Sequence, residues 1–138
     1  MGGVKKILIV EDEAILAFTL KRIVESAGHE VIGTTAYGEA AIESALSGRP
    51  DMVLMDIFLK GEMNGIETAS LISEKTNASI IFITGNTDAA TREQAMRTGP
   101  AAYMQKPIQK KELLEAMQQA LDEASTLHQG NDTVKSEG

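Results

Sequence analysis

The sequence of 138 residues contains no cysteine and only two histidines. Without cysteine, the chain has no disulfide framework, no thiolate metal site and no catalytic thiol. The two histidines, His29 and His128, offer no metal-ligand spacing. Any metal ion that this chain binds is therefore expected to be held by oxygen ligands.

Long apolar runs and an excess of positive charge are also missing. The longest uninterrupted apolar run, residues 14–18, falls far short of the roughly 20 residues that a membrane-spanning helix needs. Thirteen Lys and Arg against twenty Asp and Glu give a net charge of −7, which disfavours contact with nucleic-acid backbones and anionic lipids. We therefore predict no membrane span, no direct nucleic-acid binding and a cytoplasmic location.

What the sequence does contain is an alternation of short apolar runs with longer segments of helical period. Residues 7–10, 52–55 and 80–83 have the length and the branched side chains of strands that are buried on both faces. Strands of that kind are typical of a parallel sheet covered by helices on each side. Weaker strand character at residues 30–35 and 101–105 completes a set of five.

Apolar residues recur at helical spacing between and after these strands. The clearest stripes lie in residues 16–27, 41–46, 66–72 and 113–124. Residues 88–98 have only small or flexible apolar side chains, so we expect this fourth helix to be the most loosely packed. The order of elements predicts an α/β fold, a doubly wound five-stranded parallel sheet in a flavodoxin-like (βα)5 three-layer sandwich.

The apolar pattern stops after residue 124, and this defines the expected domain organisation. Residues 1–124 form one domain of ordinary size. Residues 125–138 are mostly polar, so we expect a disordered C-terminal tail with no further domain.

Charged or hydroxyl residues follow four of the five predicted strands. Residues 11–13 (EDE) follow the first strand, Asp56 the third, Thr84 the fourth and Lys106 the fifth. Because the carboxyl ends of parallel strands meet at one edge of a sheet, we expect these side chains to lie close together. Acidic residues at strand ends often serve only as helix N-caps, and we assign Glu13 to that role.

A cluster of carboxylates needs a compensating charge. Two carboxylates about 4 Å apart repel by about 4 kcal/mol at an effective dielectric constant near 20. A raised pKa, a cationic side chain such as Lys106 or a bound metal ion relieves this repulsion. Oxygen ligands favour Mg²⁺, Ca²⁺ or Mn²⁺. A carboxylate, a hard cation, a lysine and a hydroxyl group together are typical of a phosphoryl-transfer site.

In this order the motifs closely resemble those of the response regulator receiver family of two-component signalling, over residues 5–124. The matching segments are ILIVEDE at 7–13, VLMDI at 53–57, NGIE at 64–67, IFITG at 81–85 and YMQKPI at 103–108. The resemblance implies the strand order 2-1-3-4-5. It also implies a signalling domain that is not an enzyme and catalyses only its own phosphorylation and dephosphorylation.

The resemblance assigns roles to individual residues. It implies that Asp56 is the phospho-acceptor, with Thr84 and Lys106 as its catalytic partners, and that Thr84 and Tyr103 form a switch. It also implies a cis peptide bond before Pro107. The implied ligands of Mg²⁺, which Mn²⁺ can replace, are all oxygen atoms: those of Glu11, Asp12 and Asp56 and the backbone carbonyl of Phe58.

The same resemblance names the classes of partner. A sensor histidine kinase or a histidine phosphotransfer protein would donate the phosphoryl group. The face built by the fourth helix, the fifth strand and the fifth helix would then bind a downstream protein or a second copy of the chain. One departure lies beside the site: the spacing from Asp56 to Gly65 is one residue longer than the common family pattern, and the loop lacks the usual proline.

Three other functions share part of this pattern. A phosphate-independent, receiver-like scaffold would keep the fold without the chemistry, but no site residue is missing. A flavodoxin-like small-molecule binding module is disfavoured because the acidic loop after the first strand has no glycine-rich phosphate cradle. A hydrolase with an aspartyl-phosphate intermediate usually has a second acid two positions after the nucleophile, where this chain has Phe58.

Overall fold

Five parallel strands and five helices alternate along the chain in this computed structural model, which describes residues 3–85 and 88–137, with side chains as far as residue 126. The strands are β1 (Lys6–Val10), β2 (Glu30–Thr35), β3 (Met52–Met55), β4 (Ser79–Thr84) and β5 (Ala102–Gln105). The helices are α1 (Ala14–Ser26), α2 (Gly38–Gly48), α3 (Gly65–Lys75), α4 (Ala89–Arg97) and α5 (Lys110–Glu137). The sheet order β2-β1-β3-β4-β5, with parallel neighbours, confirms the predicted fold class and strand order.

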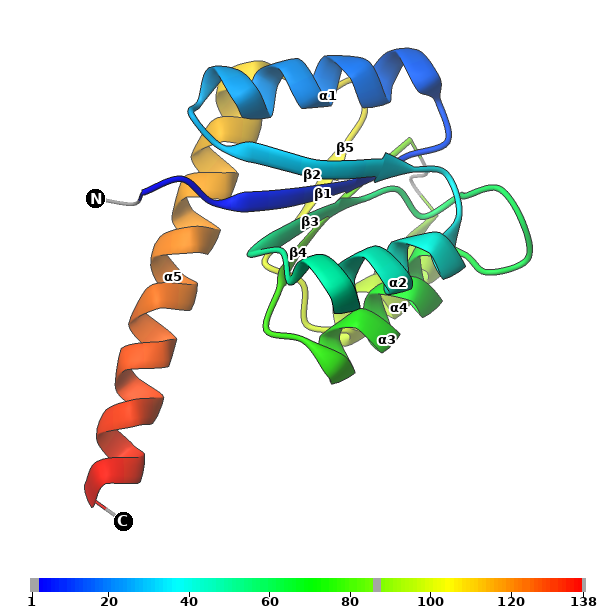
Figure 1. Ribbon diagram of the computed structural model, residues 1–138. Coiled ribbons are helices and arrows are strands. Elements are labelled where there is room, and N and C mark those ends of the chain that lie inside the picture. The colour runs from blue at the N-terminus through cyan, green and yellow to red at the C-terminus, as the bar shows by residue number, and fades with distance from the viewer. Residues whose placement is uncertain (1–2, 86–87, 138) are drawn as a thin grey trace.

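Helices cover both faces of the sheet. α1 and α5 lie on one face, and α2, α3 and α4 lie on the other (Figure 1). Because successive residues of a strand point to opposite faces, Ile7 and Ile9 of β1 join the core beneath α1 and α5, whereas Leu8 and Val10 join the core beneath the other three helices. All four side chains are fully buried, which explains the unbroken apolar run of this central strand.

The two strands with the weakest sequence signal are the two edges of the sheet. β2 and β5 each pair with one neighbour only, and most of their residues are half-buried or exposed. An edge strand buries less side-chain surface than a central strand, so its sequence needs fewer large apolar residues. This explains why the pattern was clear for β1, β3 and β4 and faint for β2 and β5.

Helix α4 has the least buried surface of its own, as its composition predicts. Ala95 is its one buried residue, and the rest of this helix, all of which the structure describes, is half-buried or exposed. The Asp88 side chain caps its first turn by accepting a hydrogen bond from the backbone N–H of Ala90 at 3.1 Å. The start of the helix is therefore fixed by its cap, while few of its side chains are buried.

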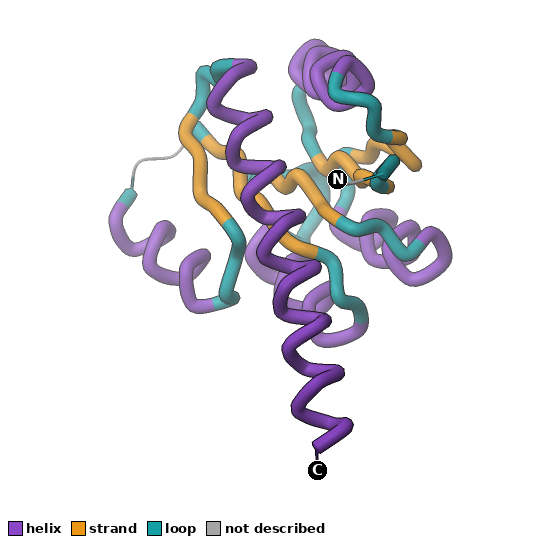
Figure 2. The backbone as a smooth tube through the Cα atoms, turned by 90° about the vertical axis from the view of Figure 1, so that its left-hand side faces the viewer, coloured by secondary structure: helices purple, strands orange, loops and turns teal. Residues whose placement is uncertain are grey.

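Helix α5 is longer than the apolar pattern indicates. We expected a disordered polar tail over residues 125–138, but the helix continues to Glu137 and projects away from the rest of the fold (Figure 2). Residues 125–137 include no proline and one glycine, so little in their sequence interrupts helical hydrogen bonding. Within the described residues, neither α5 nor any other helix combines the length and apolar character of a transmembrane span.

The loop between β3 and α3, which contains the additional residue, is attached to the connection between β2 and α2. The backbone N–H of Lys60 donates a hydrogen bond to the carbonyl oxygen of Ala36 at 3.0 Å, and Lys60 forms a parallel bridge with Tyr37. A Cβ atom on Gly38 would lie 3.1 Å from the Met63 side chain, so Met63 packs against the first residue of α2. The longer loop is thus held against neighbouring backbone.

Gly65 begins α3 at a point of close backbone contact with the end of β3. Its N–H donates a hydrogen bond to the carbonyl oxygen of Ile57 at 2.7 Å. A Cβ atom at this position would overlap the backbone carbonyl of Asp56 and lie 2.8 Å from the Ile57 Cα atom. Glycine is required here because a side chain would push α3 away from the backbone that carries Asp56.

We predict that Gly65→Ala destabilises the protein by about 1–3 kcal/mol, because the new methyl group forces the Asp56 backbone or α3 to shift. Urea unfolding measures this change. The matched control is Gly33→Ala, where a Cβ atom would make an ordinary 3.8 Å contact with Leu8. If the two variants unfold at the same urea concentration, the close approach at Gly65 does not constrain the fold.

Candidate functional site

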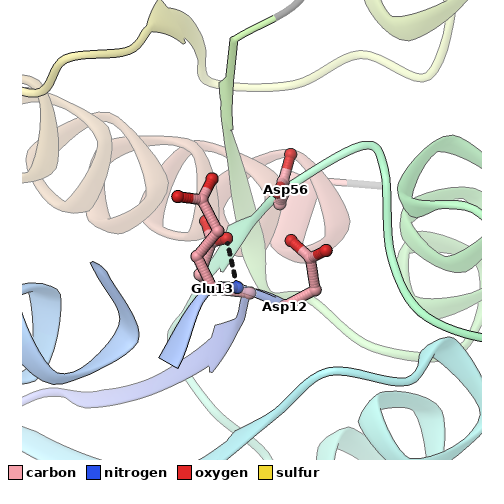
Figure 3. A group of neighbouring side chains, drawn as sticks. Asp12, Glu13 and Asp56 are labelled. Atoms are coloured by element: carbon pink, nitrogen blue, oxygen red, sulfur yellow. Dashed lines mark hydrogen bonds between the residues drawn. The ribbon is translucent and has the colours of Figure 1, made fainter. Parts of the chain in front are cut away.

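Four carboxylates gather at the carboxyl ends of β1 and β3. One carboxylate oxygen from each of Glu11, Asp12, Glu13 and Asp56 lies within 4.8 Å of the other three. Figure 3 shows three of these side chains, Asp12, Glu13 and Asp56, grouped where the two strands end. The arrangement follows from the parallel register of β1 and β3, which continues past the strands as a hydrogen bond from the Asp56 N–H to the carbonyl oxygen of Val10 at 2.8 Å.

The four carboxylates differ in their access to water. Glu11 and Asp56 are each only 4% exposed, Asp12 is half-buried, and the side chain of Glu13 is 62% exposed. A buried charge is costly unless another charge or a hydrogen bond compensates for it. Glu11 and Asp56 are therefore the two acids that most need a partner.

Lys106 is that partner. Its ammonium group donates hydrogen bonds to three carboxylates: to Glu13 Oε1 at 2.8 Å, to Asp56 Oδ2 at 3.1 Å and to Glu11 Oε2 at 3.3 Å. The lysine follows β5, and its backbone N–H donates a hydrogen bond to the carbonyl oxygen of Thr84 at 2.9 Å. The Lys106–Pro107 peptide bond is cis, which is the conformation that the family resemblance implies.

Burial dominates the acid–base properties of the two buried acids. Desolvation raises the pKa of Glu11 to about 7, with the Glu13 N–H and Lys106 opposing the shift and the charge of Asp56 adding to it. Desolvation also raises the pKa of Asp56 above its ordinary value, while hydrogen bonding and the positive charge of Lys106 counteract part of the increase. Burial thus makes the ionised form of both acids costly and favours their protonated form.

The lysine responds in the opposite sense. Partial burial alone would lower the pKa of Lys106, but its hydrogen bonds to Glu13 and Asp56 and the nearby negative charges outweigh burial and raise the pKa. Lys106 is therefore a permanent positive charge within the cluster.

The donor set fits a hard divalent cation. One ammonium group stands against four carboxylates, so ionised acids leave an excess of negative charge. Among the buried side-chain atoms that the structure describes, Glu11 Oε1 accepts no hydrogen bond, although it lies 3.2 Å from Lys106 Nζ. Carboxylate oxygens without nitrogen or sulfur ligands are suited to Mg²⁺ or Mn²⁺.

Tyr103 connects β4 to α4, and Thr84 lies at the carboxyl end of β4. Thr84 is fully buried at the end of β4. Tyr103 lies opposite Phe82 in the register of β4 and β5, and their ring centroids are 6.3 Å apart. The guanidinium group of Arg92, on α4, lies 5.2 Å from the centre of the Tyr103 ring. The aromatic ring therefore bridges the sheet and α4.

The structure brings together most of the residues selected from the sequence. Glu11, Asp12, Asp56 and Lys106 form one cluster, as their places at the strand ends indicated. The Phe58 N–H lies 3.4 Å from Asp56 Oδ1, and the role of the Phe58 carbonyl as a metal ligand stays a prediction.

Glu13 is the residue that the sequence analysis misassigned. It occupies the N-cap position of α1, but within the described residues its side chain makes no capping hydrogen bond and instead contacts Lys106. The available signal was an acid next to two others, with Lys106 expected at the same edge of the sheet.

Comparison with known proteins agrees with this geometry. A family model of the response regulator receiver domain matches residues 7–118. The chemotaxis protein CheY of Thermotoga maritima is 36% identical over 114 residues, which cover 82% of this chain and 94% of CheY. The transcriptional regulatory protein PdtaR of Mycobacterium tuberculosis is 32% identical over 117 residues, 85% of this chain. The match covers 57% of PdtaR, so this chain spans a little over half of that relative.

Solved structures give the same result. The signal receiver domain of a modulated diguanylate cyclase from Desulfovibrio desulfuricans G20 superposes with a TM-score of 0.85 and 36% identity, covering 89% of this chain and 98% of that one. A CheY-like receiver domain from Methanospirillum hungatei JF-1 has a TM-score of 0.83 and 27% identity, covering 90% and 98%. Sequence and fold thus agree from β1 into α5, and the chain belongs to the response regulator receiver domains of two-component signalling.

Proposed function

We propose that this receiver accepts a phosphoryl group on Asp56 from a histidine kinase or a histidine phosphotransfer protein. The observation that carries the proposal is the hydrogen bond from Lys106 to Asp56 at 3.1 Å, inside a cluster of four carboxylates. Receiver domains interact with donors of these two classes, which supports the choice of donor.

The chemistry follows from the groups that surround Asp56. A carboxylate oxygen of Asp56 forms a bond to phosphorus as the bond from phosphorus to the donor histidine nitrogen breaks, and the departing imidazole takes up a proton. Glu11, Asp12 and Asp56, with the Phe58 carbonyl, would hold Mg²⁺, which supplies positive charge beside the phosphoryl oxygens. Lys106 places a second positive charge on the same oxygens. Water later hydrolyses the acyl phosphate, so the domain acts only on itself.

Phosphorylation changes the domain through Thr84 and Tyr103. The added negative charge attracts the hydroxyl group of Thr84, and Tyr103 follows because its ring contacts Phe82, two residues before Thr84 on β4. Since Arg92 of α4 rests on the Tyr103 ring, the change reaches the face formed by α4, β5 and α5. That face would bind a downstream protein or a second copy of the chain.

The acceptor is tested by measuring the intact mass after incubation with acetyl phosphate and MgCl₂. We expect one added phosphoryl group on the wild type and none on Asp56→Asn. Asp122→Asn removes an exposed carboxylate on α5 and serves as the control that is still phosphorylated. If the wild type neither gains a phosphoryl group from acetyl phosphate nor binds beryllofluoride, the result would favour the alternative function of a phosphate-independent scaffold.

The metal site is tested by measuring the unfolding temperature against MgCl₂, with NaCl of equal ionic strength as the reference. Mg²⁺ should stabilise the wild type by binding only the folded state. Asp12→Asn should unfold at a higher temperature than wild type without Mg²⁺, because one repulsion is removed, yet require at least about tenfold more Mg²⁺ for the same gain. An Asp12→Asn titration that superposes on the wild-type curve would exclude Asp12 as a ligand.

The switch is tested by NMR on beryllofluoride binding, which imitates phosphorylation. In wild type we expect amide signals to move at Asp56, Tyr103 and throughout α4. Thr84→Ala should keep the changes at Asp56 and lose those in α4, because the hydroxyl group that responds to the new charge is gone. Thr126→Ala, an exposed threonine on α5, is the control. Full α4 changes in Thr84→Ala would contradict the coupling.

A further inference from the structure

The shortest contact of the Lys106 ammonium group is with an acid that the proposed chemistry does not use. Glu13 Oε1 lies 2.8 Å from Lys106 Nζ, closer than the nearest oxygen of Asp56 at 3.1 Å or of Glu11 at 3.2 Å. The Glu13 side chain is 62% exposed, whereas the other two carboxylates are almost completely buried. The lysine is therefore shared between two buried acids and one exposed acid.

The backbone of Glu13 is fixed so that its side chain reaches the lysine. Its N–H donates a hydrogen bond to Glu11 Oε2 at 2.9 Å, drawn as a dashed line in Figure 3. An acidic N-cap residue usually accepts hydrogen bonds from the first turn of its helix. In the described part of the chain, the Glu13 side chain makes no such bond and is directed to Lys106 instead.

All three N–H donors of the Lys106 ammonium group are used in hydrogen bonds to carboxylates. An ammonium group has three N–H donors, and the three carboxylates accept one hydrogen bond each. Before Lys106 can donate to a phosphoryl oxygen, it must give up one of these bonds. Asp56 is no longer a free carboxylate once its oxygen bonds to phosphorus, so Glu11 and Glu13 are the two free acids that still compete for the ammonium group. Releasing Glu11 would leave a buried charge unpaired, whereas the released carboxylate of Glu13 is solvated by water. Glu13 is thus the partner that is exchanged at least cost.

We propose that Glu13 is a positioning residue that holds Lys106 in the unphosphorylated domain and competes with the phosphoryl group for its ammonium group. The inference rests on the proposed function of Asp56 and Lys106. Glu13 accordingly opposes phosphorylation and favours loss of the phosphoryl group. A partly exposed ion pair changes an equilibrium by about two- to fivefold, and this sets the size of the effect.

Beryllofluoride titration in MgCl₂ tests the competition. Glu13→Gln keeps the length of the side chain and removes its charge, so it should bind beryllofluoride about two- to fivefold more tightly than wild type. Glu25→Gln removes the same charge from an exposed position near the other end of α1 and should leave the affinity unchanged. In a Lys106→Met background the Glu13→Gln substitution should have no effect, because the residue for which Glu13 competes is absent.

A second measurement examines the contact without any phosphoryl group. The ¹⁵N relaxation of the Lys106 ammonium group, measured without metal, should show a rigid side chain in wild type and Glu25→Gln and a more mobile one in Glu13→Gln. Equal mobility in all three proteins would overturn the holding role.

The outcomes separate this inference from the proposed function. Wild-type protein that binds no beryllofluoride would overturn the proposed function and the competition together. Equal beryllofluoride affinities of wild type and Glu13→Gln, with wild type binding, would overturn only the role of Glu13. If Glu13→Gln still tightens beryllofluoride binding in the Lys106→Met background, the effect comes from general charge repulsion between Glu13 and beryllofluoride. That result would also overturn the proposed role of Glu13.

Discussion

The parallel register of β1 and β3 is the constraint on which the site depends. It places Val10 beside Met55, and the next hydrogen bond joins Asp56 to the Val10 carbonyl. The backbone hydrogen bonds between β1 and β3 therefore hold the acids of residues 11–13 close to Asp56, which is distant in the sequence. Gly65 also fixes the position of Asp56, because the absence of a side chain allows the start of α3 to contact the Asp56 backbone. The electrostatic properties of the cluster are consequences of this backbone arrangement.

The fold was predictable because the central strands are buried on both faces. An apolar run such as residues 7–10 has few alternatives to a strand in a helix-covered parallel sheet. The edge strands and α4 were harder to recognise for the same reason, since they bury less surface. The helical conformation beyond Ala124 was not predicted, because the apolar stripe that revealed the earlier part of α5 ends there.

The candidate site was predictable as a set of positions but not as a set of contacts. Strand ends indicated that Asp12, Asp56 and Lys106 would meet, because parallel strands deliver their carboxyl ends to one edge. The sequence could not show which carboxylates the lysine would contact, since that depends on side-chain direction and burial. Glu13 illustrates the difference: its position indicated a helix cap, and only the side-chain geometry revealed its contact with Lys106.

The division of the core into two clusters has a thermodynamic consequence. The sheet separates the apolar residues beneath α1 and α5 from those beneath α2, α3 and α4. Because α4 contributes Ala95 alone to its cluster as a buried residue, displacing it exposes little apolar area and leaves the opposite cluster intact. Local opening of α4 is therefore expected to cost less free energy than opening of the central strands. A binding event that favoured a displaced α4 by a few kcal/mol would be sufficient to shift its population while the rest of the domain keeps its stability.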